Sequence, residues 1–330
     1  MSAGWHWTKA DNTVSEAIDD CSSLPKISIV TPSLNQGHYL EATIQSVLDQ
    51  GYQNLEYIII DGGSSDNSVD IIKKYQDQIH YWCSEPDSGH YAAINKGFDI
   101  ASGDIFAWIN SDDLYCPWAL HTVAQAFTQF QHMQWLSTLF PLSWDDQGYC
   151  SNVGHLPGFS RVAFLDGCYL PKFNDRVGWI QQESTFWRRK LWEDVGGLRD
   201  AIKLAADFDL WARFYEHTEL YGINTPLGGF RLYSNQRSLD ISAYFAEAEI
   251  ALFGLRESTG YHAKPDSLLR NIFSKIPIIR IYSDHYFKNR LQKYTGTQLI
   301  HAGREYSGLW KEMEIPFFSE FIRQNKKNSI

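Results

Sequence analysis

The first third of the chain alternates short apolar runs with segments in which apolar residues recur at helical spacing. The runs KISIVT, LEYIII and DIFAWI are short and rich in β-branched residues, as strands buried on both faces are. These three runs predict strands at residues 26–31, 55–60 and 104–109, and a weaker apolar run predicts another at 79–83. The intervening segments predict helices at residues 38–50, 68–75 and 91–101. Such alternation is typical of an α/β fold with a mostly parallel central sheet flanked by helices.

Polar clusters follow the predicted strands directly. Turn-forming and carboxylate side chains gather at residues 31–35, 61–66, 85–89 and 110–113. In open α/β sheets, ligands bind beyond the carboxyl ends of the parallel strands. We therefore predict one ligand-binding site along this edge of the sheet.

Beyond residue 117 the alternation loosens. Short antiparallel strands and loops are expected at residues 130–141 and 148–165. A further strand, a helix and a last strand are expected at residues 181–187, 204–217 and 220–233. Helical patterns dominate from residue 241. The predicted organisation is an N-terminal extension, an α/β domain with two halves, and a helical C-terminal region: residues 1–25, 26–240 (halves 26–116 and 117–240) and 241–330.

Charge and composition narrow the class of protein. The net charge of -10 argues against a nucleic-acid binder, which would normally carry a basic face. The five cysteines are widely spaced and odd in number, so a reducing cytoplasm is the expected compartment. No run of about 18 apolar residues predicts a membrane-spanning helix. The basic stretch 268–286 is explained either by a solvated helical surface or by peripheral contact with the inner face of a membrane.

The sequence Asn110-Ser111-Asp112-Asp113 follows a predicted buried strand. Adjacent carboxylates repel each other, so a loop that gathers them usually offers them a cation or a hydrogen-bond donor. Hard cations such as Mg²⁺ and Mn²⁺ prefer oxygen ligands and bridge to substrate phosphates. The alternative is that Asp112 or Asp113 caps the helix that begins near Pro117.

Asp61 ends the second predicted strand and is followed by Gly-Gly-Ser-Ser-Asp. Its carboxylate is suited to accept a hydrogen bond from the imide of uracil or the amine of guanine. Equally, it would serve as a turn residue that caps the next helix. The sequence has neither GxGxxG after the first strand nor GxxxxGK[ST], which removes the main support for dinucleotide and P-loop sites.

The ordered set of motifs resembles glycosyltransferase family 2. The matching segments are ISIVTPSLNQGHYLEATIQSVLDQGYQNLEYIIIDGGSSDNS, SEPDSGHYAAINKGFDIASGDIFAWINSDDLYCPWAL, QQESTFWRRKLWEDVGGL and AADFDLWARF. The resemblance implies a GT-A fold and an inverting transfer of a sugar from a UDP-, GDP- or dTDP-sugar to a saccharide or lipid-linked acceptor. It makes the first half of the domain the nucleotide-sugar side and the second half the acceptor side.

The resemblance also implies residue roles. Asp207 in AADFDLW stands at the position of the catalytic base. A Mn²⁺ or Mg²⁺ ion is implied at Asp112, with weaker candidates at Asn110 and Asp113. Donor binding is implied for Thr31, Pro32, Asn35, Asp61, Ser64, Asp87, Gly89, Asn95 and Ser111. Gln182 and Glu183 are expected on the acceptor side.

Three departures from the family pattern bear on the metal. Asn110 replaces the first aspartate of the metal motif, Ala206 replaces an acidic residue before the base, and Tyr233 stands where a histidine is common. A phenol is a poor ligand for Mg²⁺, so metal affinity is in question. They leave two rivals open: a non-catalytic member that only binds nucleotide-sugar, and a nucleotidyltransferase. Asp209 is a weaker candidate for the base; alternatively, it pairs with Arg213 on the helix surface. The tryptophans of these motifs are expected in the core: Trp187, Trp192 and Trp211.

Overall fold

A computed structural model of the chain describes residues 24–170, 177–234, 236, 241–263, 291, 293–301 and 309–317. Nearly all of the expected N-terminal extension (1–25) and the basic stretch 268–286 lie outside these residues. Within the described residues, no helix is both long enough and apolar enough to cross a membrane.

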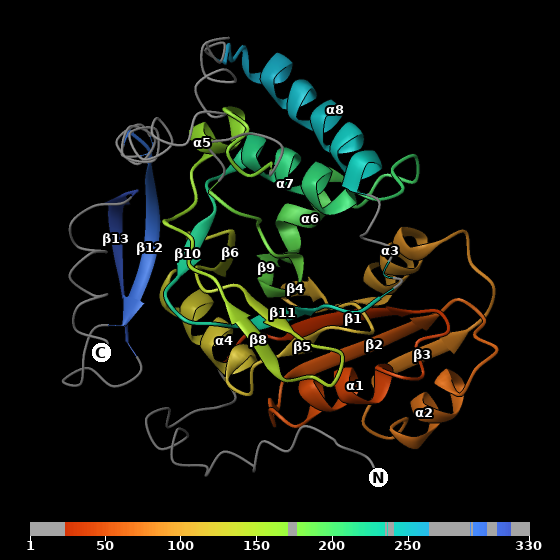
Figure 1. Cartoon of the computed structure of the whole chain (residues 1–330). Helices are drawn as coiled ribbons and strands as arrows, with labels where there is room; N and C mark the ends of the chain where they lie inside the picture. Colours follow the sequence, from red (N-terminus) through yellow and green to blue (C-terminus); the bar gives the residue numbers. More distant parts are fainter. Residues whose placement is uncertain are drawn as a thin grey trace.

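The core of the protein is a nine-stranded sheet in the order β13-β12-β10-β6-β9-β4-β1-β2-β3 (Figure 1). Its pairs are parallel except where β9 meets β4 and β6, and where β13 meets β12. The mostly parallel sheet predicted from the sequence is thus confirmed. The strands are β1 (Ile27–Ser33), β2 (Leu55–Asp61), β3 (Tyr81–Ser84), β4 (Ile105–Trp108), β6 (Trp135–Thr138), β9 (Thr185–Arg188), β10 (Tyr221–Ile223), β12 (Thr295–His301) and β13 (Trp310–Pro316).

The alternation of side chains along each strand builds a separate apolar core on each face of the sheet. Ile29 and Ile59 belong to the core under α1 (Leu40–Leu48), α2 (Ser68–Lys74) and α4 (Ala119–Gln129). Their neighbours Val30 and Ile58 belong to the opposite core, which the remaining long helices cover. These are α3 (His90–Ile100), α6 (Arg189–Val195), α7 (Ala206–His217) and α8 (Ile241–Thr259). Trp187, Trp192 and Trp211 lie in that second core, as expected.

A small second sheet lies beside the carboxyl end of β4. Its order is β5 (Leu114–Tyr115), β11 (Gly228–Arg231), β7 (Leu142–Trp144) and β8 (Cys150–Val153). Because β11 pairs with both β5 and β7, it brings Arg231 to the acidic loop that precedes β5.

The prediction of strands and loops for residues 148–165 misses a helix at the end of this stretch. The helix α5 (Arg161–Leu165) follows β8, and its residues Ala163, Phe164 and Leu165 are buried. A short apolar run packs equally well as a strand or as one helical turn, and tertiary contacts decide between them.

The helical C-terminal extension also needs correction. The helix α8 is present, but β12 and β13 follow it, and β12 pairs in parallel with β10 at the edge of the main sheet. Residues after 241 therefore extend the same sheet as well as covering it. Strand β13 alternates charged and apolar residues (WKEMEIP), a weak signal for an edge strand in a charged region.

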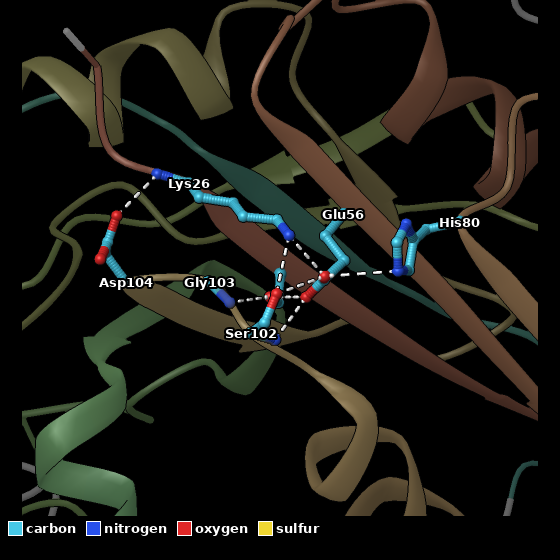
Figure 2. A network of polar contacts seen from close by, with 7 residues as sticks. Lys26, Glu56, His80, Ser102, Gly103 and Asp104 are labelled. Atoms are coloured by element: carbon cyan, nitrogen blue, oxygen red, sulfur yellow. Dashed lines mark hydrogen bonds and ion pairs between the residues drawn. The ribbon is translucent and has the colours of Figure 1, made fainter.

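One buried carboxylate ties together the amino ends of the strands, at the edge opposite the predicted site (Figure 2). Glu56 is 1% exposed and accepts hydrogen bonds from Lys26 Nζ (2.7 Å), Ser28 Oγ (2.5 Å), and both the amide (2.6 Å) and hydroxyl (2.8 Å) of Ser102. His80 Nε2 lies 3.5 Å away. Burial alone would raise the pKa of Glu56, but these hydrogen bonds outweigh it and lower the pKa to about 2.

Candidate active site

The carboxyl ends of three strands meet at one edge of the sheet. In the parallel register, Ser33 at the end of β1 lies beside Asp61 at the end of β2, which lies beside Ser84 at the end of β3. The polar clusters after these strands therefore lie along one edge, together with the loop after β4, which pairs with β1 on its other side.

Asp61 is fully buried and anchors the turn that follows it. Its Oδ2 accepts hydrogen bonds from the amides of Gly63 (3.1 Å) and Ser64 (2.8 Å) and from Ser84 Oγ (2.6 Å), while Ser64 Oγ donates to Oδ1 (2.5 Å). Beside it, the buried Ser33 Oγ has no hydrogen-bond partner among the described residues. Asp61 is thus held rigidly, and its contact with a nucleobase remains a prediction.

Other predicted donor residues divide into buried supports and exposed loop residues. Thr31 and Pro32 are buried, and the Thr31 hydroxyl lies 3.1 Å from the Tyr57 hydroxyl. Asn35 is exposed in the left-handed region (φ 52°) and connects two loops: its amide donates to Ser64 Oγ, and its Oδ1 accepts from the amide of Ser65.

The loop before α3 contributes exposed groups. The Asp87 carboxylate accepts a hydrogen bond from the amide of Gly89 (2.8 Å), which adopts a φ of 125° that favours glycine. Asn95, by contrast, uses both ends of its amide on the backbone of Leu198, at 2.9 and 3.0 Å. In this structure Asn95 joins α3 to the segment before α7, rather than presenting its amide to the donor edge.

The acidic loop after β4 holds two carboxylates with different surroundings. Both oxygens of Asp113 are bonded within the fold, whereas Asp112 has one oxygen bonded to a side chain. Asp113 is fully buried, and both its oxygens are used, by the amide of Arg231 (3.0 Å) and by Asn110 Nδ2 (3.0 Å). Burial, followed by the charges of Asp112 and Glu183, raises its pKa well above the ordinary value. Asp112 is less buried and accepts a hydrogen bond from the Tyr233 hydroxyl at 2.8 Å. Ser111, which precedes Asp112, is buried, and its carbonyl accepts from Thr43 Oγ1.

This loop fits a cation shared with a substrate, and not a cation held by protein alone. Asn110 Oδ1 is buried without a hydrogen-bond partner among the described residues, two positions from Asp112. In the described part of the chain, no three His, Cys, Asp or Glu side chains are grouped to hold a metal. Mg²⁺ is commonly held by one or two carboxylates, with waters and substrate phosphates completing its coordination. Asp112 and the orphan oxygen of Asn110 match that pattern.

Gln182 and Glu183 lie in a single 3-10 turn, Gln182–Ser184, where the sequence predicted the start of a strand. Gln182 links the strand end to the acidic loop: its Nε2 donates to the carbonyl of Trp108 (2.5 Å), and its Oε1 accepts from Asn110 Nδ2 (3.3 Å). Glu183 is 3% exposed, and its Oε1 finds no hydrogen-bond partner in the ranges that the structure describes. Both residues are therefore buried beneath the site rather than open to an acceptor.

The pKa of Glu183 is raised to about 8. Burial is the main cause, and the negative charges of Asp207 and Asp112 add to it. The hydrogen bond from Asn110 to Gln182 joins the turn of Glu183 to the acidic loop, and the charge of Asp207 also acts on Glu183. Carboxylates that lie far apart in the sequence thus converge on one region, as perturbed groups at functional sites often do.

Asp207 lies in the first turn of α7, where it is partly buried. The Tyr244 hydroxyl donates to both of its oxygens, at 3.2 and 3.3 Å. Burial raises the pKa of Asp207 to about 6, although hydrogen bonds from the Phe208 amide and Tyr244 oppose the shift. A carboxyl with this pKa is largely ionised at neutral pH and remains basic enough to take a proton, which suits a general base.

Asp209 has a different role. Its Oδ2 accepts from Arg213 Nε at 2.9 Å and its Oδ1 from Arg199 at 3.0 Å, so its charge is neutralised within the fold. The predicted pairing with Arg213 is confirmed. However, Asp209 is 2% exposed, so this is a buried ion pair instead of a surface contact.

Two residues at the site were not predicted. Arg231 is 3% exposed and donates from Nε to the carbonyl of Asp112 (2.6 Å), in addition to its amide bond to Asp113. Its sequence signal is its place two residues before Tyr233 in the segment GGFRLYSNQRS. Tyr244 lies on α8, outside every matching motif, and nothing in its local sequence indicates that it reaches Asp207.

Comparisons with known proteins identify the family of this chain. The model of the family described as Glycosyl transferase family 2 matches residues 28–134. An uncharacterized glycosyltransferase of Mycobacterium tuberculosis is 32% identical over 187 residues, which are 56% of this chain and 67% of that protein. One of Rickettsia typhi is 38% identical over 212 residues, which are 60% of this chain and 61% of the relative. This chain therefore spans about two thirds or less of these relatives.

Solved structures share the fold. The crystal structure of S. aureus TarS 1-349 in complex with UDP-GlcNAc matches with a TM-score of 0.53 at 14% identity, over 81% of this chain and 80% of that chain. At this level of identity, the likeness concerns the arrangement of strands and helices.

Proposed function

The chain belongs to glycosyltransferase family 2 and has the GT-A fold, and from this premise we propose that it is an inverting glycosyltransferase that uses a nucleotide-sugar donor. Its acceptor would be a hydroxyl of a saccharide or a lipid-linked saccharide. Asp207 would act as the general base.

The observation that carries the proposal is the state of the Asp207 carboxylate, which lies in the first turn of α7, accepts a hydrogen bond from Tyr244 and has its pKa raised to about 6. Asp112, in the loop at the strand edge, supplies a second carboxylate. In an inverting transfer the acceptor hydroxyl attacks the anomeric carbon from the side opposite the leaving nucleotide. The reaction therefore needs a proton acceptor on one side of the sugar and stabilisation of a diphosphate on the other. Asp207 and Asp112, from different parts of the chain, supply carboxylates suited to these two tasks.

Asp207 would accept the proton of the attacking hydroxyl as the new bond forms. Its pKa of about 6 predicts that kcat/KM declines as the pH falls through this value, because the protonated carboxyl cannot act as a base. Positioned general bases typically contribute about 10²–10⁴ in rate.

A divalent cation, Mn²⁺ or Mg²⁺, would be held by Asp112 and Asn110 together with the donor diphosphate. When bound, it would supply positive charge that neutralises the leaving nucleotide. Because the chain offers so few ligands of its own, we expect the cation to bind weakly without a nucleotide and more tightly with one.

The donor pocket would lie along the strand edge formed by β1, β2 and β3, with Asp61 near the base and the 85–89 loop near the diphosphate. TarS was crystallised with UDP-GlcNAc, which makes uridine diphosphate sugars the first compounds to test. A cytoplasmic enzyme with peripheral membrane contact remains an expectation from the sequence, since the stretch 268–286 lies outside the described residues.

The test begins with a thermal-shift screen of UDP, GDP, dTDP and CMP and their sugar conjugates, each with and without Mn²⁺. A ligand present at a hundred times its dissociation constant stabilises the folded state by about 2.7 kcal/mol. We expect one nucleotide family to stabilise the protein, more strongly with Mn²⁺. No stabilisation of a folded sample by any of them would refute a nucleotide-sugar site.

Turnover is then measured as nucleotide release from the stabilising nucleotide sugar, for wild type and Asp207→Asn. Loss of release with retained binding supports the proposal. Binding without release by either protein would favour the non-catalytic alternative. Pyrophosphate release from a nucleoside triphosphate would favour a nucleotidyltransferase.

A further inference from the structure

Helix α8 contacts the beginning of α7, the helix that carries the proposed base (Figure 1). Near the amino end of α8, the Tyr244 hydroxyl reaches the Asp207 carboxylate. Three residues later, Glu247 accepts hydrogen bonds from three consecutive amides just before α7: those of Lys203 (3.0 Å), Leu204 (2.8 Å) and Ala205 (2.9 Å). Side chains three residues apart lie on the same face of a helix, so one face of α8 makes both contacts.

The Glu247 contacts fix the backbone that leads into α7, whose own N-cap offers no side-chain acceptor. The first amides of a helix have no partner within the helix, and a side chain at the N-cap usually accepts from one of them. Here the N-cap is Ala205, whose methyl group cannot accept a hydrogen bond. Glu247 does not bond to those first amides; it bonds to the three that precede them, and so fixes the backbone two to four residues before Asp207.

The Tyr244 hydroxyl fixes the side chain of Asp207. Burial, followed by the charge of Asp207, raises the pKa of Tyr244 well above its ordinary value, so the hydroxyl remains a donor at any working pH. The ring is held by aromatic neighbours: Trp179 meets it edge to face at 5.3 Å between ring centroids. A donor held in this way confines the carboxylate to one orientation and favours its ionised state.

We propose that Tyr244 is a positioning residue for Asp207 and that α8 forms part of the active site of this enzyme. The inference rests on the proposed function, since it takes Asp207 as the base. The Tyr244 hydroxyl fixes the orientation of the Asp207 carboxylate and favours its ionised form. Glu247 holds the backbone that leads into the first turn of α7. Neither α8 residue needs to touch the reacting atoms.

Few titratable groups among the described residues interact with Asp207, so the pH dependence of the rate can report its pKa. Glu183, from the 3-10 turn, and Tyr244, from α8, both interact with Asp207. Tyr91, from α3, and Glu247 interact with Tyr244 itself. Among these, the Tyr244 hydroxyl is the side-chain donor to the Asp207 carboxylate, so its removal should raise the pKa of the base.

The decisive variant is Tyr244→Phe, which removes only the hydroxyl and keeps the ring against Trp179. Nucleotide release by hydrolysis is measured with the nucleotide sugar that stabilises the protein most in the thermal-shift screen, because water needs the same proton acceptor as a sugar hydroxyl. We expect kcat to fall about tenfold, the magnitude of one lost hydrogen bond to a charged group. KM for the donor should stay within about twofold, and the acidic limb of the pH profile should move to higher pH.

Two further variants separate positioning from general damage. Tyr261→Phe is the matched control, because it removes another tyrosine hydroxyl bonded to a carboxylate, that of Asp166 at 2.8 Å. It should leave kcat and the acidic limb unchanged. In the double variant Asp207→Asn/Tyr244→Phe, the second substitution should reduce kcat no further. The effects of two substitutions are not additive when both act through the same group.

The outcomes distinguish the inference from the proposed function. If Asp207→Asn keeps the wild-type rate, Asp207 is not the base, and both the proposed function and the inference about Tyr244 are overturned. If Asp207→Asn loses activity but Tyr244→Phe matches wild type in kcat and in its acidic limb, the inference alone is overturned. Equal losses in Tyr244→Phe and Tyr261→Phe would likewise overturn it, since they would show a general effect on the fold.

Discussion

Two buried glutamates at opposite ends of one sheet have pKa values shifted in opposite directions. Glu56, at the amino ends of the strands, is 1% exposed and accepts hydrogen bonds from Lys26, Ser28 and Ser102, which lower its pKa to about 2 (Figure 2). Glu183, near the carboxyl ends, is 3% exposed and has an oxygen without a hydrogen-bond partner in the described part of the chain. Its pKa is raised to about 8.

Burial disfavours the charged form of both residues, so their partners decide the outcome. Around Glu56 the fold gathers a cation and several donors. Around Glu183 it gathers further carboxylates, those of Asp112 and Asp207. The first arrangement stabilises the protein, whereas the second reduces stability and leaves groups ready to interact with a ligand, as is common where function is built.

The largest effect is expected for Asp207→Asn at the carboxyl-end cluster. The amide cannot take a proton, so the rate of nucleotide release should fall by about 10²–10⁴ while donor binding is retained. Because the variant removes a buried charge of raised pKa, its melting temperature at pH 8 should equal or exceed that of wild type. A large drop in melting temperature would mean that Asp207 belongs with Glu56 as a structural carboxylate.

Glu56→Gln should produce the reverse result. Breaking a buried charged network leaves donors unpaired, and we expect a loss of about 3 kcal/mol in the free energy of unfolding, measured in urea. Activity at low temperature should be unchanged, because Glu56 lies at the far edge of the sheet. The control Glu193→Gln, in an exposed pair with Arg189, should cost much less. Equal losses in the two variants would contradict the importance of the buried network.

The two ends should also differ in how pH changes stability. The lowered pKa of Glu56 contributes stability that is present above pH 4.5 and lost as the pH falls towards 2, so the cost of Glu56→Gln should shrink at pH 3. The raised pKa of Glu183 means that the folded state binds more protons than the unfolded state between pH 4.5 and 8. Stability therefore falls as the pH rises across this range.

Glu183→Gln tests this second slope. The variant should gain stability relative to wild type between pH 5 and pH 8, by about 2 kcal/mol once coupling to neighbouring carboxylates is allowed for. Urea unfolding at several pH values gives the difference directly. A difference that does not change with pH would show that Glu183 finds a partner in solution and that the contrast with Glu56 is smaller than the structure indicates.

The smallest effect concerns the cation. Asn110→Asp adds a charge beside Asp112, so Mn²⁺ affinity in the presence of nucleotide should rise about tenfold, or roughly 1.4 kcal/mol. The melting temperature without metal should fall slightly, because the change replaces a hydrogen bond to Asp113 by repulsion. Electron paramagnetic resonance of free Mn²⁺ measures the affinity. Unchanged affinity would remove Asn110 from the metal site.

Much of the first half of the fold could be predicted from the sequence, because local patterns determine it. The apolar runs of β1, β2 and β4 and the polar turn after Asp61 carry their signals within a few residues. Placing these ends at one edge follows from the rules for parallel sheets. What could not be predicted is how each polar group is used: Asn95 and Asp113 have the types expected of ligand-binding residues, yet their side chains bond within the fold.

The second half of the chain shows where local patterns fail. The contact between Tyr244 and Asp207 depends on how two helices dock, and helical spacing reveals which face is apolar but not which helix it meets. Similarly, β12 becomes a strand of the main sheet through its pairing with β10. Such long-range pairings override weak local preferences.

The position of α8 in the chain has a consequence for the timing of synthesis. Tyr244 is 37 residues beyond Asp207, so at about 5–20 residues per second it emerges roughly 2–7 seconds after the base. During that interval, a nascent chain on the ribosome has already synthesised β1, β2 and β3, which form the predicted donor edge. Asp207 still lacks its contact with α8. If Asp207 is the base, the donor edge and the base would then mature in sequence, and the contact that positions the base would form last.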